Sequence, residues 1–134
     1  MEIALLAPFL LLMLVGLTDI GRYTYFAIEV NNAARAGVQY GSQNQVTALD
    51  STGVTTAARN DAPNLPAPLT VAASYSCKCA DGSVADCHST TNCATSHELV
   101  YVQVQTSETF PATIRFPGLP ATLTVNGNAL MQVQ

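Results

Sequence analysis

The first forty residues carry a hydrophobic pattern that changes character halfway along. Residues 3–18 contain no charge, and Asp19 and Arg22 close this apolar run. The stretch that follows, TDIGRYTYFAIEVNNAARAGVQYG, has no proline, and its apolar and small residues recur at helical spacing. Residues 3–42 therefore predict one helix of roughly 60 Å, at 1.5 Å per residue. Its first half is apolar all round and its second half is amphipathic.

The apolar run is typical of a membrane segment rather than of a cleaved secretory signal. A secretory signal begins with basic residues and ends in a small-residue cleavage site, and neither flanks this run. A helix that crosses a bilayer usually contains about 20 apolar residues, so this run is somewhat short. Glu2 at one end, and Tyr23, Tyr25 and Phe26 at the other, are placed to lie at the two interfaces. We therefore expect this segment in a membrane or inside an assembly.

The amphipathic half contains a row of small residues, Ala33, Gly37 and Gly41, spaced four apart. Such a row lets another backbone approach the helix closely. We predict a close contact here, made either with the protein's own sheet or with a neighbouring subunit. An ordinary buried helix face is the simpler alternative.

Beyond the long helix, the pattern predicts a short helix and then strands. The polar residues 41–53 break the first helix, and residues 54–62 are expected to form a second one, with Asp50 or Ser51 as a possible N-cap. Three prolines keep residues 63–69 extended.

Alternation of apolar and polar residues predicts strands over residues 69–77 and 98–109. Residues 121–133 contain Asn126-Gly127, which suggests a turn or a bulge. Helices followed by strands indicate an α+β fold.

We expect residues 1–42 to form a hydrophobic membrane or filament-core helix. Residues 43–134 would form a β-rich globular head, an antiparallel sheet of three or more strands with a disulfide-stapled loop.

Four cysteines stand close together in the polar loop between the first two predicted strands: Cys77, Cys79, Cys87 and Cys93. An even, clustered set favours two disulfides and an oxidising compartment. A zinc site is the alternative, but the spacing C-x-C-x7-C-x5-C lacks paired C-x2-C knuckles. Because Cys77 and Cys79 end one strand and Cys93 precedes the next, we predict nested pairs, Cys77–Cys93 and Cys79–Cys87.

Composition narrows the classes of partner. The 134 residues suit one domain of ordinary size, with 10% charged residues, a formal net charge of −4 and a pI of about 4.8. The five basic residues are scattered along the sequence, so we expect no basic patch that could bind nucleic acid or anionic lipid.

Candidate chemistry is sparse. His88 and His97, with Asp81 and Asp86, lie in or beside the cysteine loop, where disulfides would consume the thiolates that a metal needs. A G-x-S-x-G motif and a glycine-rich phosphate loop are absent from the sequence. Cys77-x-Cys79 differs from the C-x-x-C of thioredoxin-like enzymes, which leaves an oxidoreductase as a remote alternative. We expect no catalytic residue, no metal site and no cofactor.

The N-terminal pattern resembles the signature of the TadE-like pseudopilins, in the tight-adherence branch of the type IV pilus and secretion superfamily. The matching features are Glu2, the Leu-rich run broken by Pro8, the segment from Gly16 to Gly21 with Asp19, and the run NNAARAGVQYG. A looser match covers the C-terminal stretch from residue 100 onward. The resemblance implies a pilin-like fold and subunit assembly through Glu2, Pro8 and the small-residue row.

The resemblance also implies a role for Glu2. In type IV pilins a prepilin peptidase removes a leader, and a glutamate near the new N-terminus neutralises the amine of a neighbouring subunit. A carboxylate in apolar surroundings is costly unless it is paired, so Glu2 would test the register of an incoming subunit. The usual pilin glutamate is the fifth residue, whereas here it is the second. The alternative is a solvated acid at a helix N-terminus, favoured by the helix dipole.

We therefore expect a pilin-like subunit that is anchored in the inner membrane and then polymerises into a homo-oligomeric helical filament at the cell surface. Prepilin peptidase and the pilus assembly machinery are partners implied by the resemblance. The alternative is a single-span, membrane-anchored extracytoplasmic adhesion module that does not polymerise.

Overall fold

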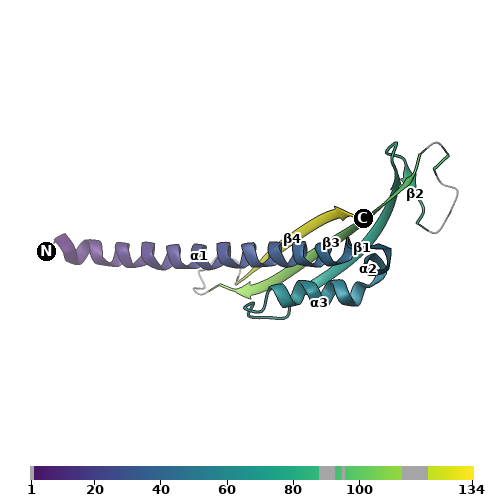
Figure 1. Cartoon of the computed structure of the whole chain (residues 1–134). Helices are drawn as coiled ribbons and strands as arrows, with labels where there is room; N and C mark the ends of the chain where they lie inside the picture. The colour runs from purple at the N-terminus through teal and green to yellow at the C-terminus, as the bar shows by residue number, and fades with distance from the viewer. Residues whose placement is uncertain (1, 88–92, 95, 113–120) are drawn as a thin grey trace.

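The computed structural model describes residues 2–87, 93–94, 96–112 and 121–134, with side chains from Leu6 onward (Figure 1). The helices of this part of the chain are α1 (Glu2–Gly41), α2 (Gln45–Leu49) and α3 (Ser51–Asp61). The strands are β1 (Thr70–Cys79), β2 (Val84–Ala85), β3 (Glu98–Pro111) and β4 (Thr122–Gln132). The α+β class predicted from the sequence is confirmed.

The strands form one antiparallel sheet in the order β2-β1-β3-β4. β3 is the central strand, paired with β1 from Glu98 to Ser107 and with β4 from Tyr101 to Pro111. The second half of α1 lies along this sheet with α3 beside it, while the first half projects beyond the head (Figure 1). The molecule is therefore a head with a helical stem.

The core lies between α1, α3 and the sheet. Residues of α1 at helical spacing face the sheet and are buried: Phe26, Val30, Ala33, Ala34, Gly37, Val38 and Gly41. Alternate residues of β3 meet them from the other side: Val102, Val104, Thr106, Glu108 and Phe110. The period of 3.6 on the helix and of 2 on the strand brings one face of each element into the same core.

Asn126-Gly127 does not form a turn or a bulge, so that expectation was wrong. Both residues lie inside β4, where the pairing with β3 runs without interruption. The reason for the glycine is tertiary: a Cβ at Gly127 would stand 2.6 Å from Thr106 Oγ1 and 2.7 Å from the carbonyl oxygen of Val30. The Thr106 hydroxyl donates a buried hydrogen bond of 2.8 Å to that carbonyl. Gly127 therefore lets α1 approach the sheet closely.

The turn after α1 is held by side-chain caps. Of the two candidate N-caps of α3, Asp50 and Ser51, Asp50 is the cap, and it accepts a 2.9 Å hydrogen bond from the Gly53 amide. The Tyr40 hydroxyl donates to the other oxygen of Asp50 at 2.9 Å, which ties the cap to the end of α1. The short helix α2 was not predicted; Asn44 and Thr47 cap it reciprocally.

Candidate functional site

The projecting part of α1, which we call the stem (residues 6–20), is the most unusual surface of the described structure. Its large apolar side chains are between 53% and 65% exposed: Leu6, Phe9, Leu10, Leu11, Leu12, Met13, Leu14, Leu17 and Ile20. Figure 1 shows this half of the helix standing clear of the sheet. A soluble protein does not leave such a contiguous apolar surface in water, so the stem is built to be covered.

The size of the stem suits a bilayer or a bundle of helices. The apolar residues 3–18, which include most of the stem, span about 24 Å at 1.5 Å per residue. This length is close to the thickness of the hydrocarbon core of a membrane, about 30 Å. The helix Leu6–Gly41, with a mean hydropathy of 1.4 in its most apolar window, is long and apolar enough to cross a membrane. Covering each large side chain is worth about 1.5–3 kcal/mol, so the stem has a strong preference for an apolar environment.

Pro8 lies inside α1 and does not end it. A proline removes one backbone hydrogen bond, which a helix tolerates when neighbouring groups in an apolar assembly compensate for it. Glu2 is the first residue of α1, and its side chain lies outside the described side chains. The pairing of Glu2 with the amine of a neighbouring subunit therefore stays a prediction.

An aromatic cluster marks the point where α1 reaches the head. The ring of Phe110 on β3 lies 4.9 Å from that of Phe26 and 6.1 Å from that of Tyr23, centroid to centroid. Phe26 is a core residue, whereas Tyr23 and Tyr25 are 42% and 48% exposed. Of the three aromatics expected at an interface, only the two tyrosines are therefore exposed enough to lie there.

The small-residue row, Ala33, Gly37 and Gly41, packs on the protein's own α3 and β3. A Cβ at Gly37 would lie 3.2 Å from both Ala58 Cβ and Val104 Cγ1. One at Gly41 would lie 2.9 Å from Val102 Cγ1. The predicted close contact is therefore made within the chain, and any part of this row in subunit assembly would act through the fold of the head.

Both disulfides exist, but the nested pairing was wrong. The bonds join Cys77 to Cys87 and Cys79 to Cys93. The strand β2 was not predicted, and its pairing with β1 sets Ala85 opposite Cys77. Because β2 runs back along β1, Cys87 lies next to Cys77 and bonds to it. Cys79 bonds to Cys93, which precedes β3 in the chain.

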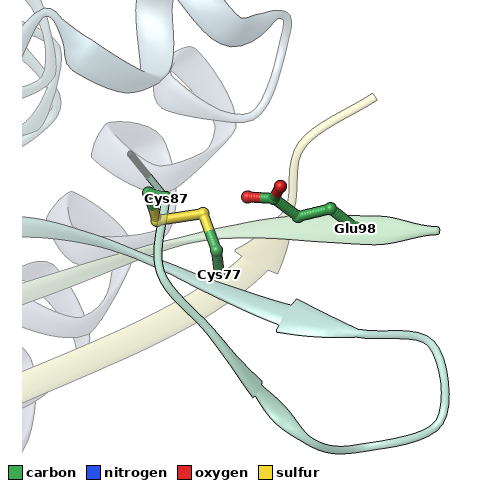
Figure 2. A group of neighbouring side chains, drawn as sticks. All are labelled: Cys77, Cys87 and Glu98. Carbon is green, nitrogen blue, oxygen red and sulfur yellow. A yellow bond between two sulfur atoms is a disulfide. The ribbon is translucent and has the colours of Figure 1, made fainter. Parts of the chain in front are cut away.

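One geometric cluster could be taken for a metal site. The ligand atoms of Cys77, Cys87 and Glu98 lie within 4.8 Å of one another. Figure 2 shows the carboxylate of Glu98 pointing toward the two bonded sulfurs. The two sulfurs are bonded to each other, so neither offers the thiolate that a metal binds. Cys77 and Cys79 also bond to different partners, which leaves no C-x-C redox pair.

The remaining polar candidates near the cysteines are partly engaged in local structure. The Ser83 hydroxyl and amide both donate to Asp81 Oδ1, and these bonds lower the pKa of the Asp81 carboxyl. The His97 carbonyl accepts from the Ala80 amide. His88 lies outside the described residues.

The comparisons agree with the geometry in singling out α1. A search of curated proteins and a search of solved structures each found no match. A family model described as TadE-like protein matches residues 1–39, which cover the stem and most of the packed half of α1. Residues 1–39 are therefore similar to the TadE-like family, which is consistent with a TadE-like, pilin-related protein.

Proposed function

We propose that this protein is a structural, non-catalytic subunit that polymerises through α1 into a filament of the type IV or tight-adherence kind, used in adhesion or secretion. The observation that carries the proposal is the stem, whose apolar side chains remain exposed while the rest of the same helix is built into the head. The inner membrane holds the subunit by the stem before assembly, and the filament then carries the head at its outside, at the cell surface.

Transfer from membrane to filament is physically reasonable. Lipid tails and neighbouring helices are equally apolar, so moving the stem from one to the other costs little hydrophobic free energy. Specific packing and pairing then decide assembly. The TadE-like match, which lies on this helix, supports a pilus-associated role. Prepilin peptidase and a pilus assembly machinery belong to the proposal as partners.

The second candidate is a single-span adhesion module that stays in the membrane. The length and hydropathy of α1 favour it equally, because one such helix is enough for an anchor. The two functions differ in what surrounds the stem. Lipid adapts to any apolar side chain, whereas a neighbouring helix requires a particular shape.

The experiment uses this difference. The variant Leu14→Phe/Leu17→Phe keeps the stem apolar but changes its shape. Electron microscopy of sheared extracellular material should show filaments for the wild type. The variant should stay in the membrane fraction while its filaments decrease at least several-fold. Wild-type cells that hold the protein in the membrane and release no filaments containing it would instead support the anchored module.

A further inference from the structure

The sheet has one face that no helix of the described structure covers. The helices pack against the side of β3 that carries Val102, Val104 and Thr106, so the alternate residues of β3 point away from them. Residues of β1 and β4 continue this other side, which we call the outer face. Its central rows are Thr70, Ser107 and Asn126; Ala72, Gln105 and Asn128; and Ser74, Gln103 and Leu130.

The outer face is polar, yet these rows carry no charge. Their side chains are hydroxyls and amides, with Ala72 and Leu130 as the two apolar members. The acid in the same part of β3, Glu108, is buried on the helix side. A surface that only has to stay in water mixes charged side chains of both signs, so this face differs from an ordinary solvated one.

A shallow hollow lies in the middle of the outer face. It has a volume of about 340 Å³, and the outer face contributes to its lining Thr70, Ala72, Gln105, Ser107, Asn126 and Asn128. Ala72 and Ser107 are shorter than the amide side chains next to them in the same rows, which leaves the space. The volume lies at the lower end of the range of about 300–1,000 Å³ that small-ligand sites occupy.

The amides around the hollow have free hydrogen-bonding capacity. Gln103 Nε2 donates to Asn128 Oδ1 at 3.1 Å, which holds the Asn128 amide in place. Within the described structure the exposed side chains of Gln105 and Asn126 have no hydrogen-bond partner. An amide offers both donors and an acceptor, and a hydroxyl group both donates and accepts. The hollow therefore matches a neutral ligand that is rich in hydroxyl groups.

Other classes of ligand match the hollow less well. An anionic polymer is bound through basic side chains, and a basic peptide through carboxylates. None of the described residues that line the hollow is charged. A protein partner is held by apolar and aromatic anchors at the centre of an interface, whereas Ala72 is the one wholly apolar side chain in this described lining.

We propose that the hollow binds a neutral polysaccharide, with the amides of Gln105 and Asn126 hydrogen-bonded to its hydroxyl groups. This inference rests on the proposed function and names what the filament adheres to. When α1 lies in the core of a filament, the helix side of the sheet faces the axis and the outer face points to the surroundings. Each copy then presents the same hollow, and many weak sites along one filament bind a single polymer with high avidity.

The test uses the full-length protein in detergent micelles, so that it does not depend on polymerisation. The probes are insoluble cellulose, chitin and cross-linked dextran, and beads of dextran sulfate provide the anionic comparison. We expect retention on at least one of the three neutral polysaccharides. Retention should be the same at low and high salt, because no charged group takes part.

Two variants locate the site. Gln105→Ala/Asn126→Ala removes the two free amides and should lower the apparent affinity at least about tenfold. Ala72→Leu fills the hollow without removing a hydrogen-bonding group and should also weaken retention. The matched control Gln39→Ala/Asn60→Ala removes the same two residue types from exposed positions on α1 and α3, and it should bind as the wild type does.

Three outcomes overturn the inference. These are no retention on any of the three neutral polysaccharides, retention on dextran sulfate alone that high salt abolishes, and equal retention of the wild type and both hollow variants. Filaments of the wild type are scored separately by electron microscopy. Binding to polysaccharide can therefore fail while polymerisation holds, and the absence of filaments contradicts the proposed function without changing the result on the beads.

Discussion

Gly127 is the position where a single methyl group should do most damage to the head. Its missing side chain leaves room for the hydrogen bond between the Thr106 hydroxyl and the Val30 carbonyl, which joins β3 to α1. In Gly127→Ala, the new Cβ would stand 2.6 Å from one partner of that bond and 2.7 Å from the other. The helix backbone cannot rotate away as a flexible side chain would, so α1 must shift off the sheet.

The magnitude follows from two terms. Overpacking of a tight interior costs about 1–3 kcal/mol. Loss of the buried hydrogen bond adds about 1 kcal/mol. The free energy of unfolding should therefore fall by roughly 2–4 kcal/mol, which for a domain near 100 residues lowers the Tm by on the order of 10–20 °C.

The assay is thermal unfolding of the full chain in detergent, followed by circular dichroism. Gly16→Ala is the matched control, because a Cβ at Gly16 would meet no atom within 4 Å apart from its chain neighbours and the backbone of its own helix, and it should leave the head unaffected. Thr106→Val removes the hydrogen bond without the clash and should cost about 1 kcal/mol. A Tm for Gly127→Ala within roughly 2 °C of the wild type would show that α1 does not pack on β4 as described.

Four further predictions concern the row, the disulfides, the cap and the N-terminus. Gly37→Leu should destabilise the head by at least about 3 kcal/mol, measured by urea unfolding, because its Cβ site is already in contact with α3 and β3. Peptide mapping without reduction should recover the pairs Cys77–Cys87 and Cys79–Cys93. The variant Cys79→Ser/Cys93→Ser should lower the free energy of unfolding by about 2–4 kcal/mol, because the Cys79–Cys93 disulfide closes a loop with a sequence separation of 14. Hydrogen bonds from the Gly53 amide, and secondly from the Tyr40 hydroxyl, lower the pKa of the Asp50 carboxyl from its ordinary value of 3.8. The cap therefore stabilises the fold fully above that pH, and this stabilisation is lost as the pH falls through the lowered pKa of the folded state. Asp50→Asn should flatten the loss of Tm below about pH 4, and an acid profile identical to that of the wild type would count against the cap. Glu2→Gln and Glu2→Ala should both leave the protein in the membrane fraction and sharply reduce filaments, and unchanged filament yields in both would remove the register role of Glu2.

The sequence alone was enough for the features that depend on near neighbours. The period of 3.6 predicted α1 over residues 3–42, within one residue of its observed bounds at either end. Alternation predicted β1 and β3, and the polar residues before a helical stretch narrowed the cap to Asp50 or Ser51, of which Asp50 is the cap. These signals arise because backbone conformation and capping are decided within a few residues along the chain. The helix α2 is five residues long, too short for a period to be visible.

The tertiary structure decided the features that join distant residues. Asn126-Gly127 has the local composition of a turn, yet Val30, almost a hundred residues earlier, requires the glycine inside a strand. The two-residue strand β2 is too short to recognise in the sequence. Its antiparallel pairing with β1 places Cys87 next to Cys77 and so determines which cysteines bond to each other. The row of Ala33, Gly37 and Gly41 predicted a close contact, but only the packed fold assigned that contact to α3 and β3. A sequence pattern states which surfaces must be covered; which element covers them depends on the space that remains once helices and strands pack together.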